Sequence, residues 1–124
     1  MIQLLIVGMG GFVGAVARWG MTGLMQRIAG GSFPVGTMVV NILGCFFLGL
    51  LMVLIEVRES IPESIRLFIG IGLLGSFTTF STFGNETLEL IRSGSIHLAL
   101  VNVFVSVVVG LGAVWLGRCL AQAC

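Results

Sequence analysis

The sequence predicts an all-α membrane protein, a single transmembrane domain over residues 1–124 that crosses the bilayer four times. Of the 124 residues, 57% are apolar and only 9% are charged, and the mean hydropathy is +1.17, far outside the range of soluble domains. A spanning helix takes about 20 residues. Four apolar runs of that length nearly exhaust these residues, so any activity is expected to lie within the membrane.

Charge and cysteine content exclude several other classes. Six Arg against five Glu give a net charge of +1, which offers no basic face for nucleic acid. The three cysteines form no C-x-x-C pair and are read as small apolar residues. The first apolar run lacks a basic leader and a cleavage pattern, so we expect a retained helix and not a signal peptide.

The first span is expected over about residues 2–28. Gly10 and Gly14 match the small-xxx-small pattern and predict close approach of a neighbouring helix. Arg18 has two interpretations: a cation that snorkels or pairs structurally, or an intramembrane cation that attracts a ligand. The structural interpretation is favoured.

The second span is expected over about residues 35–57, after a Gly-rich turn that ends in Pro34. Residues three and four apart share a helix face, so Thr37, Asn41 and Gly44 form one polar, small stripe. A buried Asn most often bonds a neighbouring helix, but its amide also offers two donors to an anion.

The third span, about residues 63–92, contains the most unusual stretch of the chain. Five of the nine residues from Gly75 to Phe83 are Ser or Thr and three are Phe. Hydroxyls at membrane depth need partners, and β-branched Thr beside Gly is a poor helix former. We therefore expect a break at 75–79 that lines a cavity or an interface.

The fourth span is expected over about residues 97–120, with Asn102 and Ser106 on one face. Four spans place both termini on one side, and the arginines then divide evenly between the two sides. The positive-inside rule gives no orientation for such a chain. Because four helices alone bury the polar residues poorly, we expect a symmetric dimer, and opposite insertion of the two copies would make it antiparallel.

The polar residues favour ion passage over catalysis. The chain has no recognisable catalytic motif, so it is not expected to be an enzyme. Hydroxyls, amides and phenyl rings with almost no full charge suit a small ion stripped of water. A cation pore would be expected to show rings of Asp or Glu, but only Glu86 lies near these groups, so an anion is favoured. The positive edges of Phe80 and Phe83 could face it. Simple packing of the Phe residues is the other interpretation.

Several motifs together resemble one family. They are Gly14-Ala15 with Arg18-Trp19, Gly36-Thr37 with Val40-Asn41 and Gly44, and Gly75 followed by Thr78-Thr79-Phe80-Ser81-Thr82-Phe83 and Glu86. In this the chain resembles, over essentially its whole length, the Fluc family of bacterial fluoride channels. The resemblance implies an antiparallel dual-topology homodimer with two pores, which exports fluoride passively across the bacterial inner (plasma) membrane and lowers cytoplasmic fluoride.

The resemblance also implies roles for individual residues. Phe80 and Phe83 match the phenylalanine pair of the pore, Asn41 the asparagine near the ion path, and Ser81 with Thr82 the polar track. Thr37 and Glu86 are expected toward one pore end, Ser106 is placed on the path by its spacing, and Arg18 and Gly44 are taken as structural. The family's structural sodium ion at the dimer interface would be bound by backbone carbonyls at Gly75 and Thr78.

Two alternatives stay open at this stage. A small proton-coupled multidrug exporter shares the size and the four spans, but it needs a carboxylate in its first helix, and no acidic residue precedes Glu56. A non-transporting membrane assembly subunit would use the Gly, Ser and Thr residues for helix packing alone.

Overall fold

A computed structural model describes residues 1–58 and 61–124 of the chain. It is all-helical: α1 (Ile2–Ala29), α2 (Val35–Val57), a third segment built from several pieces, and α6 (Ile96–Ala123). The third segment comprises α3 (Glu63–Ile65), a π-helix η1 (Arg66–Leu74), α4 (Gly75–Phe77) and α5 (Phe80–Arg92). Within these described residues, four stretches are long and apolar enough to cross a membrane, which confirms the predicted all-α class with four spans.

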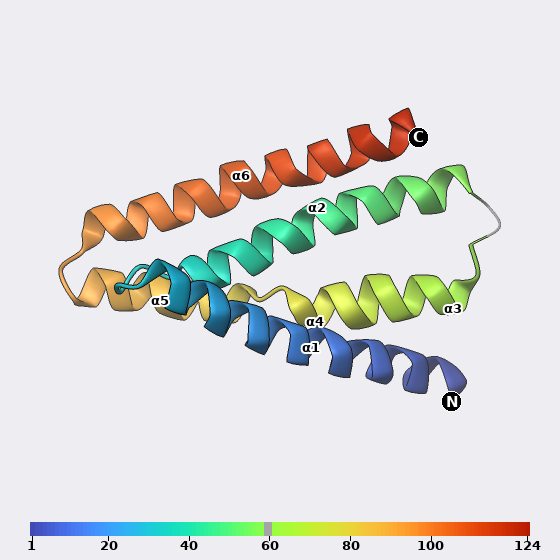
Figure 1. The fold of residues 1–124 in the computed structure, drawn as a ribbon, viewed down its shortest axis with the longest axis horizontal. Coiled ribbons are helices and arrows are strands. Elements are labelled where there is room, and N and C mark those ends of the chain that lie inside the picture. Colours follow the sequence, from blue (N-terminus) through green and yellow to red (C-terminus); the bar gives the residue numbers. More distant parts are fainter. Residues whose placement is uncertain (59–60) are drawn as a thin grey trace.

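The four segments run side by side along the long axis of the molecule, with both chain termini at the same end (Figure 1). The connections α1–α2 and α5–α6 lie at the other end. The observed helix ends lie within three residues of the predicted ones, and α6 extends furthest beyond its expected end. Assignments of a helix end commonly differ by one or two residues.

Glycines set the closest helix contacts. Gly10 and Gly14 are the buried residues of α1, and a Cβ on either would overlap a backbone carbonyl, that of Phe68 or Leu73. This confirms the close approach predicted from the small-xxx-small pattern. Gly49 lies in the same way against the backbone of Val114, so α2 and α6 also meet through a glycine.

The π-helical turns of η1 were not predicted. The apolar pattern of Arg66–Leu74 indicates only that the segment is helical, because a short apolar run does not distinguish an α-helix from a π-helix. The Gly10 and Gly14 face of α1 packs directly on this wider helix. Backbone of this kind is frequent near functional sites.

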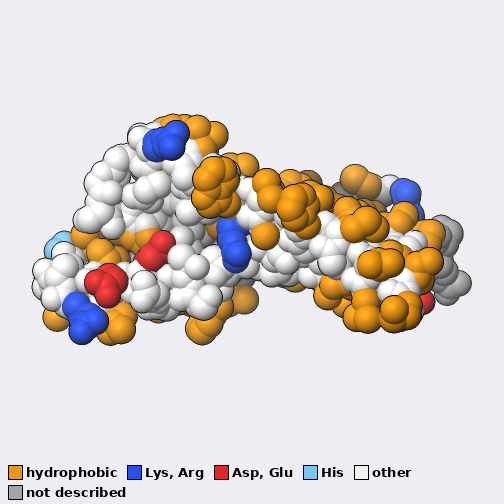
Figure 2. Space-filling model, turned by 90° about the horizontal axis from the view of Figure 1, so that it is seen from below, with side chains coloured by type: hydrophobic (Ala, Val, Ile, Leu, Met, Phe, Trp, Pro, Cys, Tyr) orange, Lys and Arg blue, Asp and Glu red, His pale blue; other side chains and the backbone are white. Residues whose placement is uncertain are grey.

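Much apolar surface remains uncovered in a single protomer. Figure 2 shows apolar side chains over much of one face, while most charged side chains lie toward the ends. Exposed side chains include Phe12, Trp19, Phe104 and Trp115. For helices with the length and composition to span a membrane, lipid acts as the solvent for such surface.

Candidate functional site

The third segment is interrupted at Thr78 and Thr79. α4 ends at Phe77, and the next two residues are extended, with φ −87° and ψ 158° at Thr78 and φ −151° and ψ 117° at Thr79. The helix resumes at Phe80. The interruption is narrower than the expected 75–79, and Gly75 is helical at φ −62° and ψ −36°. β-branched threonines, which favour extended backbone, therefore supply it, and not the freedom of glycine.

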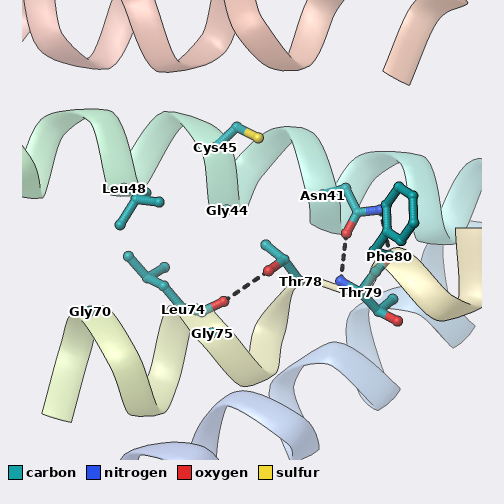
Figure 3. Close-up of a pocket in the computed structure, with 10 residues that line it drawn as sticks. All are labelled: Asn41, Gly44, Cys45, Leu48, Gly70, Leu74, Gly75, Thr78, Thr79 and Phe80. Atoms are coloured by element: carbon teal, nitrogen blue, oxygen red, sulfur yellow. Dashed lines mark hydrogen bonds between the residues drawn. The ribbon is translucent and has the colours of Figure 1, made fainter. Parts of the chain in front are cut away.

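Asn41 of α2 satisfies the interrupted backbone. Its Oδ1 accepts from the Thr79 N–H at 2.8 Å, and its Nδ2 donates to the Thr79 carbonyl at 3.0 Å (Figure 3). One amide thus serves both main-chain groups of Thr79, as a neighbouring strand would. Because the side-chain amide has two N–H protons, one remains for another acceptor.

Thr78 is held from two sides. Arg18 Nη1 of α1 donates to the Thr78 carbonyl at 3.4 Å, and the Thr78 hydroxyl donates back to the Leu74 carbonyl at 3.1 Å. On α2, a Cβ at Gly44 would overlap Cγ2 of Thr78. Arg18 and Gly44 therefore both contact the interruption itself.

Hydroxyl groups cluster at the start of α5. Thr79 Oγ1 accepts from the Thr82 N–H at 3.2 Å, which caps the helix, and donates to Thr82 Oγ1 at 3.0 Å. Ser81 Oγ lies 3.4 Å from the same Thr79 oxygen. Ser81 and Thr82 are exposed in the protomer, so the proton of the Thr82 hydroxyl, not used in this cluster, is available to an acceptor.

Phe80 and Phe83 lie one helical turn apart, with ring centroids separated by 5.7 Å and planes inclined at 44°. Phe80 is 84% exposed, whereas Phe83 is half-buried. Packing within the protomer therefore explains a Phe at position 83 in part, but it does not explain one at position 80. Phe80 borders a groove of about 280 Å³ between α2 and the third segment (Figure 3). Other residues lining the groove include Asn41, Gly44, Gly70, Gly75 and Thr78.

Thr37 and Glu86 form a pair further along α5. The Thr37 hydroxyl, in a side chain only 2% exposed, donates to Glu86 Oε1 at 2.8 Å. Glu86 Oε2 is buried and has no hydrogen-bond partner among the described residues. Ser106 Oγ on α6 is likewise buried and lacks a partner in that part of the chain, so no hydrogen bond joins it to the other predicted site residues.

Two hollows that share Thr22 lie on the face between α1, α2 and α5. The first, about 370 Å³, is lined by Arg18, Thr22, Thr37, Thr79 and Thr82, among others. The second, about 380 Å³, is lined by Thr22, Gln26, Glu86, Glu89 and Ser93, among others. Thr22 borders both hollows, so guanidinium, hydroxyl and carboxylate groups follow one another along this face.

Sequence reasoning missed part of the α5 surroundings. Thr87 was not singled out, yet its hydroxyl donates to the Phe83 carbonyl at 2.7 Å and accepts from Asn102 Nδ2 at 2.9 Å. Asn102 was recognised as polar but given no role; it is only 1% exposed. An Asn surrounded by Val and Leu in a spanning helix was the available signal.

Side-chain metal ligands do not gather in the described residues, where no group of three His, Cys, Asp or Glu is close enough to hold an ion. Any cation in this region would need backbone or hydroxyl oxygens. Such oxygens are concentrated at the interruption.

Comparison with known proteins covers nearly the whole chain. The family model described as "CrcB-like protein, Camphor Resistance (CrcB)" matches residues 5–118. The chain is 48% identical over 118 residues, 95% of this chain and 94% of the relative, to the "Fluoride-specific ion channel FluC" of Shewanella halifaxensis (strain HAW-EB4). It is 42% identical over 123 residues, 99% of both chains, to the protein of the same name from Geobacter sp. (strain M21). These matches show that the chain belongs to the CrcB-like family.

Proposed function

We propose that this protein is a fluoride channel that lets fluoride leave the cytoplasm passively and so lowers its concentration there. The observation that carries the proposal is the arrangement at the start of α5. The exposed ring of Phe80 lies 5.7 Å from the ring of Phe83, measured between centroids, and the hydroxyls of Ser81 and Thr82 belong to the same helical turn. The edge of a phenyl ring is positive, and a hydroxyl proton is a donor, so both stabilise a partly dehydrated anion. The names of the relatives support fluoride as that anion.

Fluoride would pass the ring edges and the hydroxyls of Ser81 and Thr82 and then move along α5 toward Thr37 and Glu86. The remaining N–H of Asn41 and the Ser106 hydroxyl, which has no partner among the described residues, would supply further donors. Because these groups carry no full positive charge, they bind an anion without trapping it.

We further propose that the working unit is an antiparallel, dual-topology homodimer in the bacterial inner membrane, with a Phe from each subunit at each pore. Support comes from the even distribution of arginines and from the exposed Phe80 beside an open groove. Labelling of Cys124 from each side of the membrane should modify about half of the copies from either side. Labelling of all copies from one side would contradict this.

We also propose that the carbonyls of Gly75 and Thr78 bind a structural sodium ion at the two-fold axis of the dimer. In a continuous α-helix the Thr79 N–H would serve the Gly75 carbonyl, but it donates to Asn41 instead. Among the described residues, the donor to the Thr78 carbonyl is Arg18, at the long distance of 3.4 Å. Two copies would supply four such oxygens, and carbonyl oxygens suit a hard cation.

The deciding experiment uses purified protein in liposomes loaded with potassium fluoride or potassium chloride, with efflux started by valinomycin and followed by ion-selective electrodes. We expect rapid fluoride efflux and little chloride efflux. Fluoride-tight vesicles would contradict the proposal and favour a non-transporting assembly subunit. Proton-driven uptake of a drug cation would favour the exporter, against which the lack of acidic residues in α1 already counts.

A further inference from the structure

We infer that Asn102 of α6 is a positioning residue that sets the rotation of α5, and thereby the orientation of Phe83, through the hydroxyl of Thr87. The link is a directed chain of two hydrogen bonds. Asn102 Nδ2 donates to Thr87 Oγ1 at 2.9 Å, and Thr87 Oγ1 donates to the Phe83 carbonyl at 2.7 Å. The single hydroxyl proton of Thr87 is thus committed to Phe83, and its lone pair receives the Asn102 proton.

Apolar packing alone anchors α5 weakly. Of its 13 residues, only Leu90 is buried within the protomer, so little apolar contact opposes a rotation of this helix about its axis. Phe83, Glu86 and Thr87 are half-buried, and side-chain hydrogen bonds to α2 and α6 add to this partial packing. An interhelical hydrogen bond therefore contributes more to fixing the rotation of α5 than it would for a helix with a well-packed apolar face.

Two of these links leave α5 in different directions. Glu86 is bonded to Thr37 of α2, and the next residue, Thr87, is bonded to Asn102 of α6. Consecutive side chains on an α-helix point about 100° apart. One tether would let the helix pivot, but two tethers to two different helices define its rotation. Phe83 lies one turn before Thr87, so its ring orientation is set by the same pair.

The burial of Asn102 agrees with this role. The side chain is 1% exposed, and a polar amide at membrane depth costs free energy unless it is hydrogen-bonded. The hydrogen bond of Asn102 goes to Thr87 and not to a hydroxyl of the proposed ion path. It acts on the path through the position of α5.

The test compares three changes that remove or keep the tether. Asn102→Leu keeps the approximate shape and removes the donor, Thr87→Val removes the hydroxyl, and Thr87→Ser keeps it. The control is Ser64→Ala, because Ser64 is exposed on α3, at the end of the molecule away from α5 (Figure 1). Each variant carries 4-fluorophenylalanine at position 83, so that ¹⁹F NMR reports the ring environment whether or not fluoride is conducted.

Asn102→Leu and Thr87→Val should each shift or broaden the ¹⁹F resonance and lower fluoride efflux roughly ten-fold, since small misplacements of positioning groups have effects of that order or larger. The double variant should be no worse than either single one, and Thr87→Ser and Ser64→Ala should match the parent protein. Parental spectra in both tether variants, each with normal elution on gel filtration, would overturn the inference. So would additive effects in the double variant.

The inference rests on the proposed function only for its efflux arm. If the parent protein does not conduct fluoride, the proposed function fails, but the ¹⁹F comparison still decides whether Asn102 orients Phe83. If the parent conducts and the spectra do not change, the tether fails alone.

Discussion

The side-chain amide of Asn41 replaces a missing peptide partner for Thr79, accepting from its N–H at 2.8 Å and donating to its carbonyl at 3.0 Å. The pair stabilises an interruption that would otherwise leave polar backbone groups without partners at membrane depth. It also draws the Thr79 N–H away from the Gly75 carbonyl. The same contact therefore holds α2 against the site and frees an oxygen there.

Asn41→Leu should lower both stability and fluoride efflux, because it leaves the N–H and the carbonyl of Thr79 unpaired. A buried polar group without a partner costs about 1–3 kcal/mol. Thermal unfolding in detergent and liposome efflux measure the two effects. Cys45→Ala, one turn along α2 in the same groove, serves as the control. An unchanged melting temperature in Asn41→Leu would show that the pair does not support the interruption.

Phe80→Ile and Phe83→Ile should each reduce fluoride efflux about ten-fold or more, equivalent to about 1.4 kcal/mol of lost ion stabilisation, while the protein keeps its elution volume. The ring edge is lost, but apolar volume is roughly kept. Phe104→Ile is the matched control, since Phe104 is 66% exposed on α6 and outside the site. Parental efflux in both pore variants would return the two rings to a packing role.

Gly44→Ala should destabilise the protein by about 1–3 kcal/mol through overpacking, because its Cβ would overlap Cγ2 of Thr78. Combining it with Thr78→Ser should recover most of the loss, since serine lacks that methyl group but keeps the hydroxyl that bonds the Leu74 carbonyl. Chemical denaturation in detergent measures both variants.

Gly112→Ala provides the control for this pair of variants, since a Cβ there meets nothing within 4 Å. It should be neutral or slightly stabilising, because Ala is the better helix former. A double variant no more stable than Gly44→Ala would contradict the steric explanation.

Thr37→Val should reduce efflux several-fold, because it removes the donor that holds Glu86 Oε1 at 2.8 Å. Glu86 Oε2 already lacks a partner among the described residues, so the carboxyl group would lose its recorded tether and change position in the path. Thr37→Ser keeps the hydroxyl and should restore efflux. Equal efflux in the valine and serine variants would show that the hydroxyl has no part in conduction.

Replacing sodium with a large organic cation on both sides of the membrane should weaken dimer association if sodium binds the freed Gly75 and Thr78 carbonyls. Cross-linking in detergent at several protein concentrations measures the association, and efflux is followed in parallel. A dimer that is equally stable without sodium would contradict the proposed sodium site. The fluoride path is tested separately, by the efflux assay.

The sequence by itself determined the class of the protein and the location of its unusual stretch. Composition requires a membrane environment, since no soluble core of 124 residues absorbs so much apolar surface. The dense Ser, Thr and Phe run marks the candidate site, and the glycine spacing of α1 predicts its close packing. These features are local, so periodicity and composition suffice to find them.

The tertiary structure decided which groups satisfy one another. The interruption falls at two β-branched threonines, Thr78 and Thr79, and it is stabilised by Asn41, 38 residues earlier, which pairs with the Thr79 backbone. Gly75 remains helical. The pairing of Thr37 with Glu86 spans 49 residues, and that of Asn102 with Thr87 joins two helices. No local pattern predicts such pairs, because they depend on the rotation and axial offset of packed helices, which many side chains set together.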